Sequence, residues 1–312
     1  MSEPNRSRRQ VVIFLLLVFA FSSIFYFLIL TAHNLKAEAG LYTTGLMWSP
    51  ALAAVVTLKL NRRRLSELGW KWPETRYALA SWLIPLLYAT IAYLIVWIFG
   101  LGGFPSQEFM EHLVGTMGLH APPAVSTIVY LLLVGSVGLI HSIGNALGEE
   151  IGWRGFLVPE LFKTAGFTGT ALISGLIWSF WHYPVLIGAD YNAGTPTWYG
   201  LTCFTVMVVS ASFIFTWMRL KSGSLWVGAL LHASHNLYVQ HIFTPLTRKS
   251  GYTPWLIDEF GAVLPIVVNS LCYLFLAEKG RIAACCCPAS KRRKRAELIP
   301  LGQRLQDWSR PV

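Results

Sequence analysis

Eight apolar runs, each about 20 residues long and so able to cross a hydrocarbon core of about 30 Å, follow one another along the chain. They lie at 11–31, 41–58, 77–100, 125–148, 168–188, 199–218, 225–243 and 260–277. Only 13% of the 312 residues are charged, against roughly 25% in a soluble globular domain. In lipid the backbone must satisfy its own hydrogen bonds, so such runs predict helices. The predicted fold class is therefore all-α, a polytopic membrane helix bundle of about eight transmembrane helices.

The basic residues predict how this bundle lies in the membrane. The chain has 25 Lys and Arg and a formal net charge of +10. If the N-terminus is cytoplasmic, all of these residues except Lys36, Arg248 and Lys249 fall at the predicted inner side. Because cytoplasmic loops carry the excess of basic residues, we predict that the N and C termini are both cytoplasmic. The charge is thereby explained by topology, and no nucleic-acid partner is expected.

The apolar runs leave no room for a separate soluble domain. We expect a cytoplasmic N-terminal tail at 1–10, a membrane domain at 11–278 and a basic cytoplasmic tail at 279–312. The first run is too long for the apolar region of a signal peptide and is taken as a helix. The five cysteines show no plausible pairing across an outer loop, so no disulfide framework is predicted. An integral, multi-pass membrane protein is expected, in the cell membrane if the source is prokaryotic.

Two adjacent carboxylates, Glu149 and Glu150, stand at the end of the fourth run. On a helix they diverge by about 100°, and Glu150 is four residues from Arg154, close enough to form an ion pair. Glu149 is then left for another role. It continues a polar stripe with His141 and Asn145 at four-residue spacing, which faces a bundle interior or a wet cavity. The alternative is a solvated helix end that carries ordinary charges.

The histidines of the later runs are further candidates. His182 lies within the fifth run among aromatic residues, where a neutral histidine bonded to a neighbouring helix is the alternative explanation. His232 and Asn236 are four residues apart and project from one helix face. An imidazole and a carboxamide on one face can both donate hydrogen bonds to an oxyanion. His235 points about 60° away from His232 and is a weaker candidate.

Three polar motifs therefore occur in a fixed order between residues 125 and 243. They are Glu149-Glu150-x-x-x-Arg154, Trp178-x-x-x-His182 and His232-x-x-x-Asn236. In residue type, order and separation they resemble the motifs of the CAAX-protease and bacteriocin-processing (CPBP) family of intramembrane glutamic endopeptidases, which includes the CAAX prenyl endopeptidase. The second motif usually opens with Phe, so Trp178 replaces one aromatic residue with another.

This resemblance implies a membrane-embedded peptidase that needs neither metal nor cofactor. Its substrate is a peptide or protein, lipidated for some family members, and its surroundings are the lipid bilayer. The implied roles are Glu149 as the general base for a water, His182 as its assistant, His232 and Asn236 as the oxyanion hole, and Glu150 with Arg154 as structural support.

Three alternatives remain open at this point. Zinc is a rival because Glu and His are good zinc ligands, although the His-Glu-x-x-His pattern is absent. Some family members act without proteolysis, so the same pocket could serve binding in a membrane immunity or scaffold protein. The predicted boundaries also separate the residues: Glu149 falls at the cytoplasmic edge, whereas His182 lies about 20 Å along its helix. A shared site therefore requires one boundary to be wrong.

Overall fold

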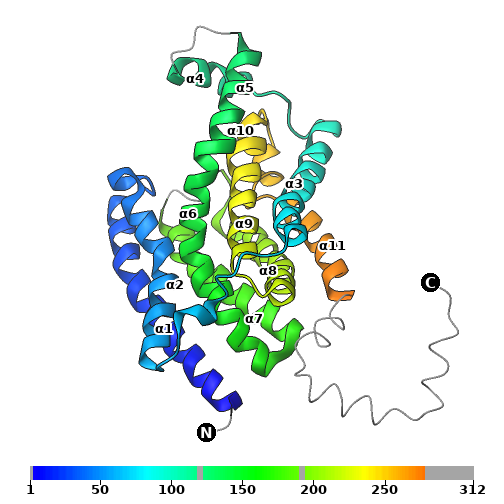
Figure 1. Ribbon diagram of the computed structural model, residues 1–312. Coiled ribbons are helices and arrows are strands. Elements are labelled where there is room, and N and C mark those ends of the chain that lie inside the picture. The colour runs from blue at the N-terminus through cyan, green and yellow to red at the C-terminus, as the bar shows by residue number, and fades with distance from the viewer. Residues whose placement is uncertain (1–2, 118–121, 190–193, 278–312) are drawn as a thin grey trace, which may run out of the picture.

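The computed structural model describes residues 3–117, 122–189 and 194–277, and it is built from helices (Figure 1). In these ranges no β-strand is assigned, so the all-α prediction is confirmed. The predicted tail at 279–312 lies outside the described residues. The α-helices are α1 (Glu3–Ala32), α2 (Leu41–Leu60), α3 (Thr75–Ile98), α4 (Gln107–Met117), α5 (Pro123–Leu133), α6 (Leu139–Glu150), α7 (Val158–Gly188), α8 (Thr197–Ser222), α9 (Trp226–His235), α10 (Thr244–Leu246) and α11 (Val263–Ala277).

Five helical segments of the described chain are long and apolar enough to cross a membrane. They are Glu3–Ala32, Leu41–Leu60, Thr75–Ile98, Ala124–Gly188 and Thr197–Ser222, and Val263–Ala277 is a shorter apolar helix. Many large apolar side chains on these helices point outward, as lipid-facing residues do. The chain therefore has the helices of an integral membrane protein.

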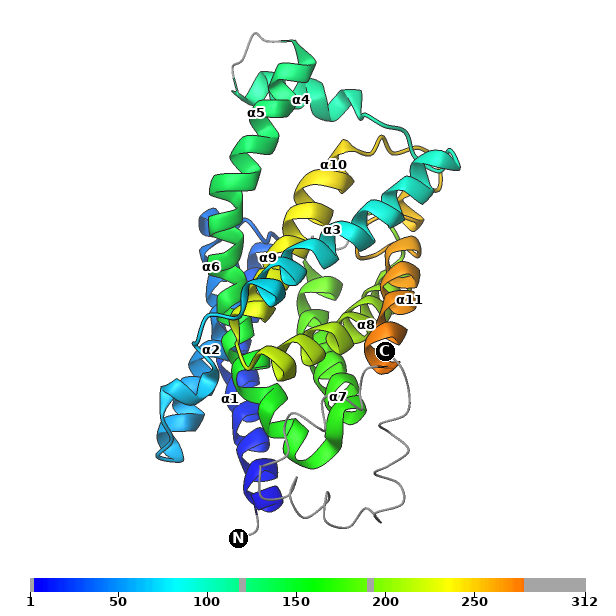
Figure 2. The same cartoon turned by 45° about the vertical axis from the view of Figure 1, so that its right-hand side comes forward.

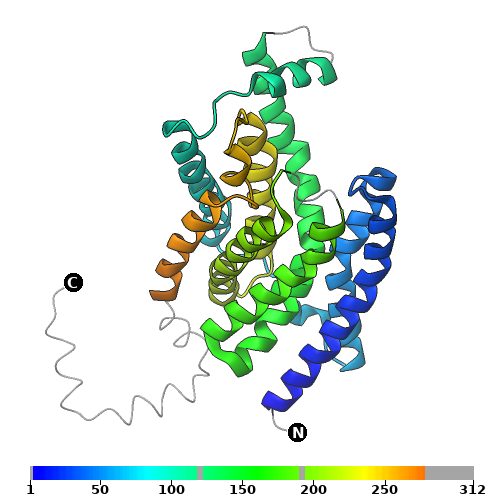
Figure 3. The ribbon, with the colours of Figure 1, turned by 180° about the vertical axis from the view of Figure 1, so that it is seen from behind.

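The helices that carry the polar motifs stand in the middle of the bundle. From behind, α1 and α2 flank one side and α3 and α11 the other, with α6 to α9 between them (Figure 3). The view turned by 45° shows the same central position for α9, between α6 and α3 (Figure 2). Contacts agree, since α6 packs on both α2 and α9 and α7 packs on α1 and α8.

The helix that carries the first motif continues well past its predicted end. After α6 the chain forms a π-helix at Ile151–Leu157 and passes directly into α7. The break comes only at Gly166, where φ is 64° and ψ is −173°, a conformation open to glycine. The boundary at residue 148 and the inner loop at 149–167 were therefore wrong. Arg154, assigned to that loop when the topology was predicted, is 2% exposed within the helix.

This correction places the motifs at one depth. Gly166 lies 17 residues after Glu149 and 16 residues before His182, so the two side chains are equally far from the turn. The helix can continue through three charged residues because each of them has a buried partner, as described below.

Two glycines allow α2 to approach the motif helix closely. A Cβ on Gly148 would lie 2.8 Å from the carbonyl oxygen of Met47, and a Cβ on Gly152 would lie 2.4 Å from Cβ of Pro50. Since any larger side chain would push the helices apart, these glycines permit the contact that covers Glu149 on the α2 side.

The N-terminal helix is tied to the turn region by a buried carboxylate. Glu160 accepts hydrogen bonds from Ser7 at 2.8 Å and from Arg63 at 2.7 Å, and Arg63 also donates to Gln10 at 2.7 Å. Helix α1 begins at Glu3, so most of the predicted tail at 1–10 continues the first helix.

Candidate active site

Glu149 is buried, and two tryptophans hold one of its oxygens. The indole Nε1 of Trp178 donates to Oε2 at 2.7 Å, and that of Trp153 donates to the same atom at 3.3 Å. The side chain is 1% exposed. Among the residues that the structure describes, hydrogen bonds reach only Oε2 of Glu149, which leaves Oε1 for a water molecule.

Glu150 points elsewhere and forms the predicted ion pair. Its Oε1 lies 2.8 Å from Nη1 of Arg154 and 3.2 Å from Nδ1 of His232. The guanidinium of Arg154 lies 4.0 Å from the ring centroids of both Trp178 and Phe215. A buried charge is tolerated when it is paired in this way and stacked between aromatic faces. The prediction that Glu150 binds Arg154 while Glu149 faces another group is confirmed.

Trp178 brings the three motifs together. Its ring centroid lies 5.4 Å from that of His232 and 6.1 Å from that of His182. Nδ1 of His182 lies 2.9 Å from the carbonyl oxygen of Trp178. A carbonyl can only accept, so Nδ1 carries a proton, and in the neutral form of the ring Nε2 is then the acceptor. Glu149, His182 and His232 therefore surround one indole, and the separation expected between Glu149 and His182 does not exist.

Asn236 follows His232 by four residues and opens a second π-helix, Asn236–Phe243. Its side chain is half-buried, and none of the described residues hydrogen-bonds it. Single turns of π-helix occur frequently at functional sites, because they shift the side chains that follow. The amide of Asn236 is thus available to a ligand near His232.

His141 and Asn145 do not join this cluster. His141 is exposed and Asn145 half-buried, and Nδ2 of Asn145 lies 3.4 Å from Nδ1 of His141. No hydrogen bond or ion pair within the described ranges links either residue to Glu149 or His182. His141 and Asn145 lie on the predicted stripe, but they take no part in the hydrogen bonds of Glu149, which ends it.

His235 belongs to a separate buried cluster that sequence reasoning missed. Its Nδ1 lies 2.7 Å from the hydroxyl of Tyr88, and its Nε2 lies 2.7 Å from Oε1 of Glu259. Gln240 donates to the same carboxylate oxygen at 3.1 Å. Burial raises the pKa of Glu259, but the hydrogen bond and the electrostatic attraction of His235, together with the hydrogen bond of Gln240, outweigh it and hold this pKa below its usual range. The signal available in the sequence was a pair of acidic residues, Asp258 and Glu259, directly before the last apolar run.

The Glu and His side chains of the motifs left zinc binding open as an alternative. Within the described part of the chain, no group of three or more His, Cys, Asp or Glu side chains is arranged to hold a metal ion. That the reaction needs no metal stays a prediction.

Comparisons with known proteins cover the same part of the chain. Residues 124–238 match the family described as "Type II CAAX prenyl endopeptidase Rce1-like". A curated relative, "CAAX prenyl protease 2" of Methanococcus maripaludis, is 31% identical over 94 residues, which are 28% of this chain and 34% of the relative. The chain therefore spans well under half the length of that relative. The resemblance to the CAAX-protease family, inferred from the three motifs, is confirmed for this segment.

Proposed function

We propose that this protein is an intramembrane endopeptidase in which Glu149 activates a water molecule. The observation that carries the proposal is the state of the Glu149 carboxylate. One oxygen is held by two indole N–H groups, and the other has no hydrogen bond from the described residues. The indole of Trp178, which donates to Glu149, also packs against the rings of His182 and His232. Water activation needs a base whose position is fixed while one of its oxygens can still accept a hydrogen bond from water. The family match supports the same activity.

In the proposed reaction, Oε1 of Glu149 takes a proton from water, and the resulting hydroxide oxygen bonds to the carbonyl carbon of the peptide. His182 presents Nε2 as an acceptor, because its Nδ1–H is given to the carbonyl of Trp178. It therefore assists by orienting the water. When the C–N bond later breaks, the proton held by Glu149 passes to the departing amine, which restores the carboxylate.

The oxyanion formed by the attack needs hydrogen-bond donors. Nδ1 of His232 faces the carboxylate of Glu150, which favours the imidazolium form with a proton on each nitrogen. Nε2–H of His232 and the side-chain amide of Asn236 are the proposed donors to the oxyanion. Glu150 and Arg154 support this arrangement by fixing His232, and no metal or cofactor takes part.

The proposed topology has eight crossing helices and both termini in the cytoplasm. Segment 124–188 is 65 residues long and supplies two of them, divided at Gly166. The segments 225–243 and 260–277 supply the last two. Reporter fusions in the 189–197 connection and at the C-terminus should report opposite sides of the membrane. Two fusions on the same side contradict this topology.

The proposed substrate is a peptide or protein tail that reaches the site from the membrane. Because the matching family and relative are named for CAAX prenyl substrates, the first probe is a prenylated peptide ending in a CAAX sequence, presented to the purified protein in liposomes. Release of a C-terminal fragment is measured by mass spectrometry. We expect Glu149→Ala, His182→Ala and His232→Ala each to abolish cleavage, and His141→Ala to retain it. Cleavage by Glu149→Ala would contradict the proposal. Loss of wild-type activity on adding a chelator would favour a zinc-dependent reaction.

A binding role for the same pocket is separated from catalysis by Glu149→Gln. A carboxamide keeps the shape of the side chain but cannot accept the proton of water. If the cellular phenotype of the protein survives this substitution, the pocket serves binding. We expect the phenotype to be lost together with cleavage.

A further inference from the structure

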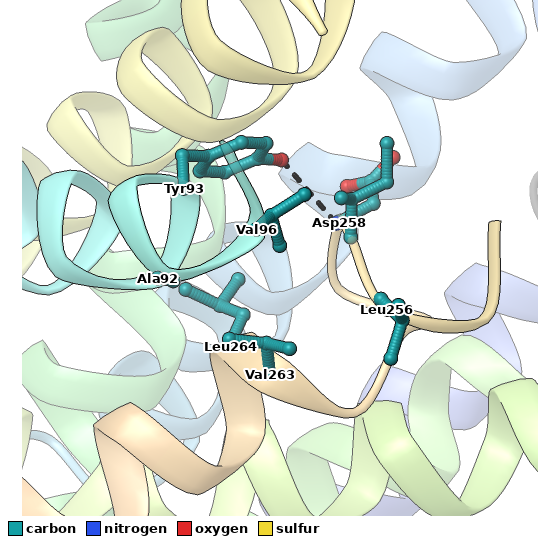
Figure 4. Close-up of a pocket in the computed structure, with 8 residues that line it drawn as sticks. Ala92, Tyr93, Val96, Leu256, Asp258, Val263 and Leu264 are labelled. Atoms are coloured by element: carbon teal, nitrogen blue, oxygen red, sulfur yellow. Dashed lines mark hydrogen bonds between the residues drawn. The ribbon is translucent and has the colours of Figure 1, made fainter. Parts of the chain in front are cut away.

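A second buried carboxylate, Glu259, has no part in the reaction described above. It lies in the irregular segment between α10 and α11 and is 4% exposed. Helix α3 holds the neighbouring residue: the backbone N–H of Asp258 donates to the hydroxyl of Tyr93 at 3.2 Å, as the dashed line in Figure 4 shows. The hollow of about 140 Å³ beside this bond is lined, apart from Asp258, by uncharged residues. Glu259 therefore belongs to a segment that α3 fixes in place.

Glu259 binds donors on both sides of the point where α9 becomes a π-helix. Its Oε1 lies 2.7 Å from Nε2 of His235, the last residue of α9. Nε2 of Gln240, within the π-helix Asn236–Phe243, donates to the same oxygen at 3.1 Å. The other ring nitrogen of His235, Nδ1, lies 2.7 Å from the hydroxyl of Tyr88 on α3. One carboxylate oxygen thus joins the two ends of the first π-turn.

The separation of these two donors suits a π-turn. A π-helix bonds residue i to residue i+5, and His235 and Gln240 are five residues apart. In an α-helix, side chains five residues apart diverge by about 140°, so a single oxygen could not take both donors from one side. The shared contact with Glu259 therefore stabilises the π-turn relative to an α-helical continuation of α9.

In an α-helical turn, the side chain of Gln240 would lie over that of Asn236. Residues four apart share one face of an α-helix, and Gln and Asn side chains at that spacing form hydrogen bonds. Here Nε2 of Gln240 donates to Glu259 instead. The side chain of Asn236 forms no hydrogen bond with the described residues. The π-turn thus separates two amides that would otherwise bind each other.

We propose that Glu259 is a positioning residue for the oxyanion hole: by binding His235 and Gln240 it holds the π-turn and keeps the amide of Asn236 open to the substrate. The proposal rests on the oxyanion role given above to Asn236. The contact with His235 needs only an N–H on Nε2, which both the neutral and the protonated ring can provide. Tyr88 then ties the same ring to α3.

The test removes the acceptor that holds both donors. Glu259→Leu keeps the approximate volume of the side chain but frees Gln240 to bind the amide of Asn236. We expect kcat for the prenylated peptide to fall roughly ten-fold, with KM nearly unchanged. Glu259→Gln keeps an oxygen that accepts both hydrogen bonds and should restore most of this loss. Glu160 is an equally buried carboxylate that holds α1 away from the site, so the control Glu160→Leu should lower thermal stability and keep the wild-type kcat.

A double-mutant cycle with Asn236→Ala distinguishes positioning from general loss of structure. If Glu259 acts through the amide of Asn236, Glu259→Leu should lower kcat little once that amide is removed. An equal loss with and without the amide, or wild-type kcat in Glu259→Leu alone, overturns the proposal. Wild-type kcat in Asn236→Ala contradicts the oxyanion role itself and removes the proposal with it.

If Glu259→Leu does not fold, Gln240→Glu decides the question. A carboxylate at position 240 cannot donate to Glu259 and is repelled by it, so it should turn to the amide of Asn236, four residues earlier. kcat should again fall roughly ten-fold, and an unchanged kcat overturns the proposal.

Discussion

The indole Nε1 of Trp178 lies 2.7 Å from Oε2 of Glu149, so the aromatic residue that opens the second motif is bonded to the acidic residue of the first. Phe, the usual residue at this position of the family, has no N–H and cannot make this contact. In this protein the tryptophan therefore does more than pack. It fixes the carboxylate by one oxygen, in the orientation that the proposed general base needs.

Replacing Trp178 with Phe is expected to reduce kcat roughly ten-fold or more, because the carboxylate of Glu149 is no longer held in one orientation. The substitution keeps an aromatic ring against Arg154 but removes the stronger donor to Glu149. The measurement is kcat for cleavage of the prenylated peptide at neutral pH.

The control for Trp178→Phe is Trp97→Phe. The indole of Trp97 donates to Thr247 at 3.0 Å, away from the carboxylates. This variant should keep the wild-type kcat. An equal loss of kcat in both variants would mean that the effect comes from general loss of packing rather than from the contact with Glu149.

Asn236→Ala should reduce kcat by about two orders of magnitude, the usual effect of removing one oxyanion donor, and leave KM nearly unchanged. The side chain forms no hydrogen bond with the described residues, so its loss leaves no buried partner unpaired and the fold should persist. Asn145→Ala, which removes an amide bonded only weakly to His141, is the matched control with wild-type kcat. Wild-type turnover by Asn236→Ala would contradict an oxyanion role.

Gly228→Ala should disrupt the support around Arg154. A Cβ at this position would lie 2.5 Å from Oε2 of Glu150 and 3.3 Å from Cβ of Arg154, and both side chains are held by their ion pair. We expect a loss of about 1–3 kcal/mol in stability and reduced activity. In Gly144→Ala the new methyl group meets nothing within 4 Å, so this control should be neutral or stabilise the helix. Thermal unfolding in detergent compares the two variants, and equal melting temperatures would refute the steric argument.

Asp258→Asn should stabilise the protein at pH 8 more than at pH 5. Burial, together with the neighbouring charge of Glu259, raises the pKa of Asp258 from 3.8 to about 6. Because the folded-state pKa is raised, the associated stability is present below pH 4 and is lost as the pH rises through 6. The ionised form therefore costs up to about 3 kcal/mol at pH 8, and the amide avoids this cost.

Asparagine suits this position in two further respects. Asp258 has a φ of 67°, a conformation that asparagine also adopts. Its Oδ1 accepts the N–H of Glu259 at 2.8 Å, and an amide oxygen can do the same. The melting temperatures of both proteins at pH 5 and pH 8 give the result. A gain of the same size at both values would show that ionisation of Asp258 is not its cause.

The apolar runs were sufficient to predict the fold class and most helices. Helices of the described chain cover all eight predicted runs, because length and composition decide what can lie in lipid. Glu150 and Arg154 were also predictable as a pair, since helical spacing alone brings residues four apart together. The end of the fourth run was not predictable, because a charged residue normally marks the edge of the membrane. Here Glu149, Glu150 and Arg154 continue a helix, and Trp178 and His232 on other helices add contacts to the two carboxylates.

The sequence by itself determined an all-helical membrane protein and the residues of its three motifs, because periodicity and hydrophobicity are local properties of the chain. Only the tertiary structure decided that the indoles of Trp153 and Trp178 converge on one oxygen of Glu149, and that Tyr88, His235 and Glu259 form one chain of hydrogen bonds. These contacts join positions up to 147 residues apart in the sequence. No local sequence pattern specifies the distances in space between these side chains, because they depend on how closely the helices pack.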